Sequence, residues 1–404
     1  MESPLPNPSF DFPPPPQKTK RFSVILIVAL LLVGLVVGGA IGYTVTYSDF
    51  NNRLTSLQSQ LGIYQNSGNS NAQTYVLNDN VSLSALYQDV KSSVVVIQDL
   101  VAGYAMFGAR VYTLQQGSGF VAEVNNQLIV ITNNHVIEGA INITVTFVDG
   151  NSYPAIVLGQ DAKADLALLS VPSMPDSITP LTLISSTTLQ VGDPVVAVGS
   201  PYGLAGTLTT GIISALGRTI IEDSSSSHDG QTIADTIQTS TPINSGNSGG
   251  PLLNYAGEVV GITTAGIADS QGLGFAIPSS TIMREITSLV TTGSHDQHPS
   301  INADGVDMNY QIAQAMGSSV TYGWLVESVS SNNGLEGGDR YQAILGDNVI
   351  IGGDIIMAIN NVRIANSDDL LSYLEQHTLP GQTVNFTIVR DGQTQSVQVT
   401  IGKA

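Results

Sequence analysis

Gly246-Asn247-Ser248-Gly249-Gly250-Pro251 is the stretch of this 404-residue chain from which both fold and chemistry are inferred. A backbone turn can present a serine that lies between small residues. Glycine at position 246 lets successive N–H groups point toward one spot, as a developing oxyanion requires. A serine in a glycine-rich turn is also common in ordinary loops, so the interpretation depends on partners elsewhere in the chain.

A serine nucleophile needs a base, and five histidines are available. His135 directly follows a β-branched run that predicts a buried strand, where a purely structural histidine is the alternative. His228 lies in a polar run, and His377 ends an amphipathic helix. His295 and His298 have an i, i+3 spacing that could suit a metal, but the sequence around them offers no further ligand. We therefore interpret that pair as part of a linker and predict no metal site and no cofactor.

The carboxylate that would orient His135 has two candidates. Asp165 opens the apolar run Asp165-Leu166-Ala167-Leu168-Leu169, and Asp161 stands four residues earlier. The residues alone leave this choice open.

The chain resembles trypsin-type serine proteases of the HtrA/DegP family. Their motifs occur here in the order His, Asp, Ser, which distinguishes chymotrypsin-like enzymes from subtilisins and α/β-hydrolases. Seven blocks match in register: Gly117-Ser118-Gly119-Phe120, Thr132-Asn133-Asn134-His135-Val136, Asp165-Leu166-Ala167-Leu168-Leu169, Gly199-Ser200-Pro201-Tyr202-Gly203, Gly211-Ile212-Ile213-Ser214, Gly246-Asn247-Ser248-Gly249-Gly250-Pro251 and Gly274-Phe275-Ala276-Ile277-Pro278.

The resemblance implies a mainly β fold, with two six-stranded barrels and a catalytic triad at their junction. Ser248 would attack the scissile carbonyl, His135 would act as base and then acid, and Asp165 would orient the imidazole. Asp165, not Asp161, occupies the family's catalytic position. The oxyanion hole would be the turn Gly246, Asn247 and Ser248, through the N–H groups of its first and last residues.

Substrate specificity is predicted from the segments on either side of the serine. In this fold they line the pocket for the residue before the cut. Neither segment offers a buried acid, so we expect small or medium aliphatic side chains there rather than Lys or Arg. The alternative is that positions 263–267 form a loop outside the pocket. The predicted substrate-binding residues are Pro242, Thr263, Thr264, Ala265, Gly266 and Ile267.

The N-terminal region predicts a membrane anchor. Residues 1–22 form a Pro-rich tail with Lys18, Lys20 and Arg21, and residues 23–45 contain an uncharged apolar run long enough to span a bilayer. The positive charges precede that run, so we expect a cytoplasmic N-terminus and an extracytoplasmic remainder. A cleaved signal peptide is the alternative. Residues 46–75 predict a short amphipathic helix and a flexible linker.

The amino-acid composition restricts which partners and which surroundings we expect for this protein. The formal net charge is −19, which argues against nucleic acid as a partner. No cysteine is present, so disulfides do not brace the exported part. The surface is polar but weakly charged, and few Lys and Arg would limit charge gained in acid. We therefore hypothesise an acidophilic source, with an ordinary acidic extracellular protein as the alternative.

Two further domains are predicted after the linker. Residues 76–293 alternate short β-branched runs with Gly, Asn and Asp turns and form the protease domain. Residues 301–404 resemble a PDZ domain, although positions 332–351 are longer than its usual link. Such domains pair a peptide's C-terminal strand with a sheet edge, so the implied ligand is an apolar C-terminus. The predicted peptide-binding residues are Tyr322, Gly323, Trp324, Leu325, Val326, Leu370 and Leu374.

Three functions compete at this point. The first is a membrane-anchored, ATP-independent endopeptidase that degrades unfolded or damaged extracytoplasmic proteins. The second is a holding chaperone, and the third is a PDZ scaffold with an inactive protease. The family resemblance also implies a homotrimer or a larger assembly. The intact His, Asp and Ser motifs argue against the third function.

Overall fold

A computed structural model describes residues 82–104, 110–175, 178–200, 206–222, 231–244, 246–264, 272–331 and 333–404. These all belong to one compact unit, Asn80–Ala404. The predicted tail 1–22, membrane anchor 23–45 and linker 46–75 lie outside the described residues. Within the described ranges, no helix combines the length and apolar character needed to cross a membrane.

The first barrel closes in the strand order β1-β2-β3-β6-β5-β4, with neighbouring strands antiparallel. Helix α2 (Leu83–Val90) and the 3-10 turn η1 (Lys91–Ser93) precede it, and the one-turn helix α3 (Asn134–Ile137) follows β3. The strands are β1 (Val94–Tyr104), β2 (Arg110–Val124), β3 (Gln127–Thr132), β4 (Ala140–Thr146), β5 (Ser152–Asp161) and β6 (Leu166–Ser170).

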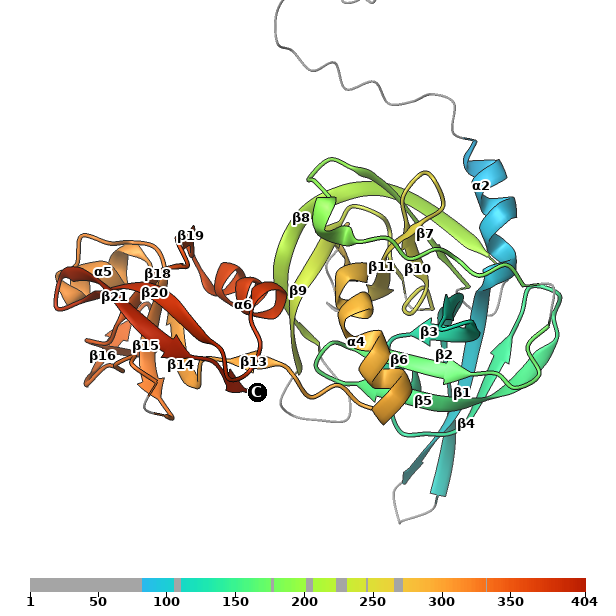
Figure 1. The fold of residues 1–404 in the computed structure, drawn as a ribbon, viewed down its shortest axis with the longest axis horizontal. Helices are drawn as coiled ribbons and strands as arrows, with labels where there is room; N and C mark the ends of the chain where they lie inside the picture. Colours follow the sequence, from blue (N-terminus) through green and yellow to red (C-terminus); the bar gives the residue numbers. More distant parts are fainter. Residues whose placement is uncertain are drawn as a thin grey trace, which may run out of the picture. The chain divides into compact units, whose positions relative to one another are not determined.

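The second barrel closes in the order β10-β11-β12-β9-β8-β7, so the prediction of two six-stranded barrels is confirmed (Figure 1). The 3-10 turn η3 (Ser186–Thr188) leads into it, and helix α4 (Ser279–Thr292) follows it and ends at Gly293 in the left-handed conformation. The strands are β7 (Pro194–Gly199), β8 (Thr207–Glu222), β9 (Gln231–Thr239), β10 (Pro251–Leu253), β11 (Val259–Thr264) and β12 (Gly274–Pro278).

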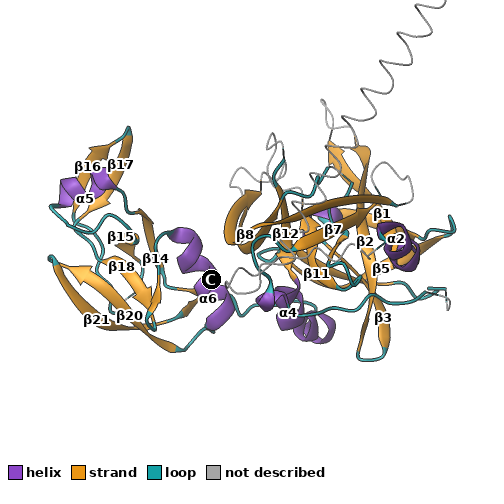
Figure 2. Ribbon diagram, turned by 90° about the horizontal axis from the view of Figure 1, so that it is seen from above, coloured by secondary structure: helices purple, strands orange, loops and turns teal. Residues whose placement is uncertain are grey.

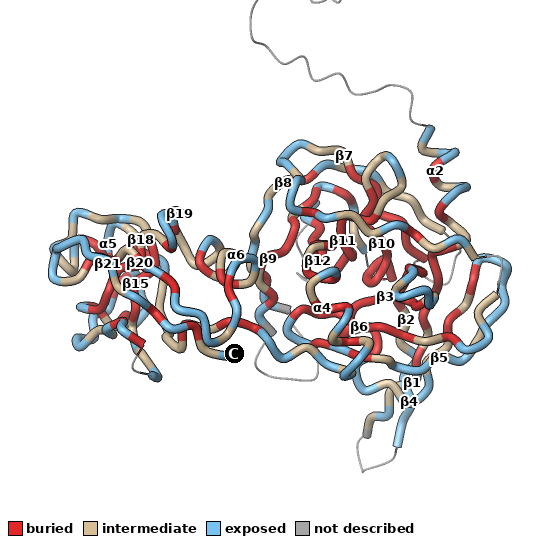
Figure 3. Tube along the Cα trace, in the orientation of Figure 1, coloured by how far each residue is buried: buried red, intermediate tan, exposed pale blue. Residues whose placement is uncertain are grey.

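Apolar β-branched runs form the core of both barrels. Ile129, Val130 and Ile131 of β3 are at most 2% exposed, because the two faces of this strand meet two different packed clusters. The larger cluster extends from the first barrel to the second and includes Ile282 and Leu289 of α4. Figure 3 shows this buried chain running through both barrels. Burial on both faces explains why these strands lack a polar alternation.

The C-terminal domain is built on a separate antiparallel sheet (Figure 2). Its strands lie in the order β14-β15-β18-β20-β21. The long segment that departs from the usual PDZ pattern folds as the separate hairpin β16–β17. The elements are β13 (Pro299–Ser300), β14 (Ala303–Asp307), α5 (Tyr310–Met316), β15 (Trp324–Val329), β16 (Arg340–Ile344), β17 (Asp347–Ile351), β18 (Ile355–Ile359), β19 (Val362–Arg363), α6 (Ser367–His377), β20 (Thr383–Arg390), β21 (Gln393–Thr400) and β22 (Gly402–Lys403).

Helix α6 joins this domain to the second barrel through polar contacts. Arg218 of β8 forms an ion pair with Asp368 at 2.9 Å, and the same carboxylate accepts the Thr219 backbone N–H at 2.8 Å. One turn further along α6, the Ser372 hydroxyl lies 2.8 Å from the Asp235 carboxylate of β9. Apolar residues on the opposite side of α6, such as Leu374, pack into the PDZ core.

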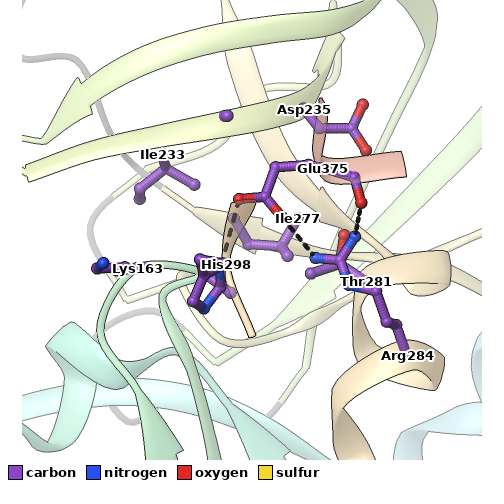
Figure 4. Close-up of a pocket in the computed structure, with 10 residues that line it drawn as sticks. Lys163, Ile233, Asp235, Ile277, Thr281, Arg284, His298 and Glu375 are labelled. Atoms are coloured by element: carbon purple, nitrogen blue, oxygen red, sulfur yellow. Dashed lines mark hydrogen bonds and ion pairs between the residues drawn. The ribbon is translucent and has the colours of Figure 1, made fainter. Parts of the chain in front are cut away.

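A buried charge cluster lies where the linker meets α6 (Figure 4). His298 lies between Asp161, with Nε2 2.7 Å from Oδ2, and Glu375, with Nδ1 3.2 Å from Oε1. Although burial disfavours the cation, hydrogen bonds to these carboxylates raise the pKa of His298 to about 9. Arg284 contacts both Glu285 and Glu375, at 2.9 and 3.1 Å. Burial, together with the charge of Asp161, raises the pKa of Glu285 to about 8.

Asp99 of β1 is a carboxylic acid placed in a core position. Val95 and Ile97 precede it at steps of two, so all three side chains point to one face of the strand, and Asp99 is 1% exposed. Neither carboxyl oxygen has a partner in another described residue. Burial raises the pKa of Asp99 to about 6, partly offset by its own backbone N–H. The protonated form is therefore the one that the fold stabilises.

Replacing Asp99 by Asn should stabilise the protein at neutral and alkaline pH. The folded pKa exceeds the ordinary value of 3.8, so the contribution of Asp99 is fully present below about pH 4 and is lost as pH rises through 6. The gain should approach about 3 kcal/mol at pH 8 and vanish near pH 4. Thermal unfolding of Asp99→Asn and parent across this range measures it. Asp149→Asn is the control, because hydrogen bonds from Asn151 lower the pKa of Asp149. If the free energies of unfolding of Asp99→Asn and the parent differed by the same amount at every pH, the prediction would be contradicted.

Candidate active site

Ser248 lies in a tight turn that precedes β10 and is 6% exposed. The Gly249 N–H donates to the Thr263 carbonyl at 2.9 Å, and the Thr263 hydroxyl donates to the Asn247 carbonyl at 2.7 Å. Gly249 has φ 86°, and a Cβ there would lie 2.0 Å from the Ser118 carbonyl oxygen. Only glycine fits this position, because an L side chain would meet both backbone strain and a backbone clash.

His135 is held at the end of a buried strand. Strand β3 ends at Thr132, Asn133 precedes α3, and His135 is the second residue of that helix. The His135 side chain is 27% exposed, and its Nδ1 lies 2.9 Å from the Oδ2 atom of Asp165. The carboxylate therefore fixes the proton on Nδ1 and leaves Nε2 as the basic nitrogen.

Asp165 orients this imidazole from the turn between β5 and β6. Its backbone is left-handed, with φ 50°, which is uncommon for a residue other than glycine. The Asn133 side-chain amide donates to the Asp165 carbonyl at 2.9 Å and helps to hold this conformation. The carboxylate is 1% exposed and also accepts the His135 backbone N–H at 2.9 Å. The competing candidate, Asp161, pairs with His298 instead, and so the geometry favours Asp165.

The second barrel also contacts this carboxylate, and sequence reasoning missed that role. The Thr264 hydroxyl, at the end of β11, lies 3.3 Å from the Oδ2 atom of Asp165. We predicted Thr263 and Thr264 as residues that line the substrate pocket. Both are 0% exposed, and their side chains orient the Ser248 turn and Asp165. Their place in the substrate pocket stays a prediction.

Strand β2 brings the two halves of the site together. The Ser118 N–H donates to the Ser248 carbonyl at 2.8 Å, and the Ser118 hydroxyl donates to the Gly246 carbonyl at 2.6 Å. A Cβ at Gly117 would lie 2.6 Å from Val136 of α3 and 3.3 Å from the Ser248 carbonyl. Glycine there lets the histidine helix and the serine turn approach the same strand. The sequence contained Gly117-Ser118-Gly119 only as a motif without an assigned role.

Other predicted substrate residues are less defined. Pro242 is exposed, ahead of the serine turn, and its carbonyl accepts the Thr209 hydroxyl at 3.1 Å. Ala265, Gly266 and Ile267 lie outside the described residues. Gly246, with φ 96°, Asn247 and Ser248 are buried in one turn, where we predicted the oxyanion hole.

The predicted peptide-binding strand needs a correction. Strand β15, which contains Trp324, Leu325 and Val326, is paired with β14 on one side and β18 on the other. It therefore has no free edge for a peptide. Leu370 and Leu374 are at most 2% exposed and pack in the domain core. Tyr322 stacks under Arg363 at 4.2 Å, and Gly323 donates to Ala365. The free edge on this side of the sheet belongs to β14.

Both domains match known families. Residues 117–262 match the trypsin-like peptidase domain, and residues 296–401 match the PDZ domain. Protease Do-like 1 of Arabidopsis thaliana is 33% identical over 80% of this chain and 72% of its own length. Serine protease Do-like HtrA of Lactobacillus helveticus is 31% identical over 96% and 97%. The periplasmic pH-dependent serine endoprotease DegQ of Escherichia coli is 36% identical over 70% of this chain, which spans 59% of DegQ.

Solved structures agree with these relatives. The HtrA-type protease AlgW with a tripeptide has a TM-score of 0.59 at 27% identity, and the match covers 80% of this chain and 97% of AlgW. The serine endoprotease from Yersinia pestis has a TM-score of 0.51 at 26% identity, with coverage of 80% and 98%. With a serine in a glycine turn and a histidine oriented by a buried aspartate, the chain belongs to the HtrA/DegP family and is a serine endopeptidase.

Proposed function

We propose that this protein is a membrane-anchored, ATP-independent endopeptidase that degrades unfolded or damaged extracytoplasmic proteins. The observation that carries the proposal is the Asp165 carboxylate, which fixes the His135 imidazole while strand β2 holds the Ser248 turn beside the histidine helix. This arrangement supports acyl transfer by a serine nucleophile.

In the proposed mechanism, the Ser248 hydroxyl attacks the scissile carbonyl while His135 Nε2 accepts the hydroxyl proton. The imidazolium is stabilised by Asp165 and returns the proton to the leaving amine. Water then attacks the acyl-enzyme with the same base, which regenerates Ser248. The N–H groups of Gly246 and Ser248 stabilise the oxyanion, and each such donor contributes about 10²–10³ in rate.

Specificity for small or medium aliphatic residues remains part of the proposal. It rests on Pro242 and on the segment that follows β11. The one acid of the sequence between Gly261 and Pro278 is Asp269, which stands in the polar run Asp269-Ser270-Gln271 rather than among the apolar residues expected to line the pocket. Mass spectrometry of the peptides from a digested unfolded protein locates the cuts. A majority of cuts after basic residues would exclude this pocket.

We propose that the free edge of β14 receives an apolar C-terminus. The N-terminus of α6 lies beside that strand, since the Ser367 N–H donates to the Asp307 carboxylate at 2.6 Å. The next residue of α6, Asp368, pairs with Arg218 of the second barrel. Peptide binding would therefore be communicated to the protease domain through this pair.

The anchor, the assembly and the source remain proposals from sequence. Names of relatives such as the periplasmic DegQ support an extracytoplasmic location. We place the anchor at residues 23–45 and expect a homotrimer or larger assembly, with acidic surroundings suggested by the few basic residues. A holding chaperone is the alternative function, because unfolded chains are ligands for both activities.

Removing any member of the triad should abolish proteolysis. Ser248→Ala, His135→Ala and Asp165→Asn should each lower kcat on unfolded casein by at least about 10⁴, and a double variant should be little worse than either single one. Labelling by a fluorophosphonate probe and circular dichroism separate loss of chemistry from loss of fold. Asp161→Asn is the comparison: it breaks the buried pair with His298 and lowers stability, but the folded protein should retain the acyl-enzyme chemistry. Equal damage from Asp161→Asn and Asp165→Asn would contradict the assignment.

Thr264→Val should lower kcat while leaving KM nearly unchanged. Valine keeps the shape but removes a hydrogen bond to a carboxylate, worth about 1.5–3 kcal/mol, so we expect a loss of about 10- to 100-fold. Steady-state kinetics on a short peptide measure it, with Thr291→Val on the exposed face of α4 as the control. A raised KM with unchanged kcat would instead indicate that Thr264 contacts substrate.

Asp368→Asn should weaken the response to peptides without impairing basal hydrolysis. The substitution removes the ion pair with Arg218 but leaves the triad intact. Rates on a short chromogenic peptide are measured with and without an added peptide that has an apolar C-terminus. Asp347→Asn in the β16–β17 hairpin is the control. An unchanged response in Asp368→Asn would exclude this contact as the link between the domains.

A further inference from the structure

Three potential metal ligands converge at the end of helix α4. Glu285 lies on α4, and His295 and His298 lie on the linker that leads from α4 to β13. One nitrogen or oxygen atom from each residue lies within 4.8 Å of the other two. In the sequence, only the i, i+3 spacing of the two histidines suggests a metal site. Glu285 is ten residues before His295 and approaches the histidines only because the linker folds back along helix α4.

Glu285 has an oxygen that the protein leaves without a donor. Its side chain is 0% exposed, and Oε1 accepts a hydrogen bond from Arg284 at 2.9 Å. Oε2 is buried and receives no hydrogen bond from any described residue. While Glu285 is protonated, its carboxyl group hydrogen-bonds to Asp161. Once Glu285 is ionised, the buried oxygen has no donor among the described residues, and a bound cation is one way to compensate for this cost.

The hydrogen bonds around His295 leave one nitrogen for a ligand. The Ser288 hydroxyl donates to the Glu285 carbonyl at 2.8 Å, so its oxygen accepts from the His295 Nδ1–H at 2.9 Å. This fixes the tautomer with an unprotonated Nε2, which is how outer hydrogen bonds orient a metal-binding imidazole. The ring of His298 stands nearly perpendicular to it, with centroids 5.2 Å apart.

We propose that Glu285, His295 and His298 bind a divalent transition-metal cation of the zinc class. Imidazole nitrogens with a carboxylate oxygen suit Zn²⁺, with bonds of about 2.0–2.2 Å. The three ligand atoms, each within 4.8 Å of the other two, must draw closer together to reach those bond lengths. With three protein ligands, water would take the fourth position of a tetrahedral site. The inference does not depend on the proposed function.

The charge of the cluster is compatible with a dication. Asp161, Glu285 and Glu375 supply three carboxyl groups, against the guanidinium of Arg284 and the imidazole of His298. Binding would displace the protons held by His298 and Glu285, because metal ligands must be deprotonated. A dication replaces those two protons without changing the net charge.

A bound metal would tie the linker to the protease domain. Two of its ligands lie on the segment between the domains, and His298 also contacts Glu375 of α6. Metal binding by His298 would therefore weaken its contact with Glu375 and change the strength of the contact between α6 and the linker. This makes the site a control point for the domain junction rather than for the triad.

Titration of the metal-free, full-length protein with Co²⁺ tests the proposal. Visible ligand-field bands should report one tetrahedral site per chain, and Zn²⁺ should displace the Co²⁺. His295→Asn and Glu285→Gln should each weaken binding at least about 10-fold. His377→Asn, an exposed histidine on α6, is the matched control and should bind as the parent does.

Labelling with a fluorophosphonate probe confirms that each variant is folded. His295→Asn is the more informative variant, because His295 is only half-buried and its replacement leaves the ion pairs of His298 in place. Absence of one-to-one binding in the parent would overturn the proposal. Binding that survives both His295→Asn and Glu285→Gln would overturn it too, since the metal would then lie elsewhere.

Discussion

The buried carboxylate of Asp165 is the point on which the catalytic geometry depends. It accepts hydrogen bonds from the backbone and side chain of His135 in the first barrel and from Thr264 in the second. A charge that is 1% exposed is tolerated only when it is fully hydrogen-bonded. The two barrels must therefore stay in register for this carboxylate to remain satisfied, and the same register positions the Ser248 turn.

A second set of buried charges fixes the geometry of the junction between the protease domain and the PDZ domain. His298 is placed between a carboxylate of each domain, and although burial opposes ionisation, its hydrogen bond and charge hold the pKa of Asp161 below the ordinary value. Such pairs add little net stability over apolar packing, but removal of one partner is strongly destabilising. The junction between the protease domain and the PDZ domain therefore requires a specific geometry of these side chains.

The barrels could be predicted from sequence because their signals are local. Runs such as Leu128–Thr132 are β-branched, apolar and bounded by turn residues, and they became the strands expected of them. At the level of sequence, the choice between Asp161 and Asp165 rests on motif resemblance, because four residues of spacing do not reveal which carboxylate turns toward His135. Thr264 and Glu285 act through partners far away in sequence, so no local pattern identifies their roles.

The PDZ strand was misjudged for a related reason. Trp324-Leu325-Val326 has the apolar character of a strand, but its position in the sheet is decided by which strands pair on either side. The segment Ala303–Asp307, whose sequence is less apolar, pairs with this strand and forms the edge of the sheet. The pattern identifies a strand, whereas long-range pairing decides whether a peptide can reach it.

Strand β22 has a practical consequence for handling the molecule. It pairs with β13 directly after the linker, the Ala404 N–H donates to the His298 carbonyl at 2.9 Å, and Lys403 pairs with Asp296. Residues 402–404 are therefore bound to the linker by backbone and side-chain contacts. An affinity tag fused after Ala404, or a force applied there in a pulling experiment, would act first on the segment between the domains and only afterwards on the PDZ sheet.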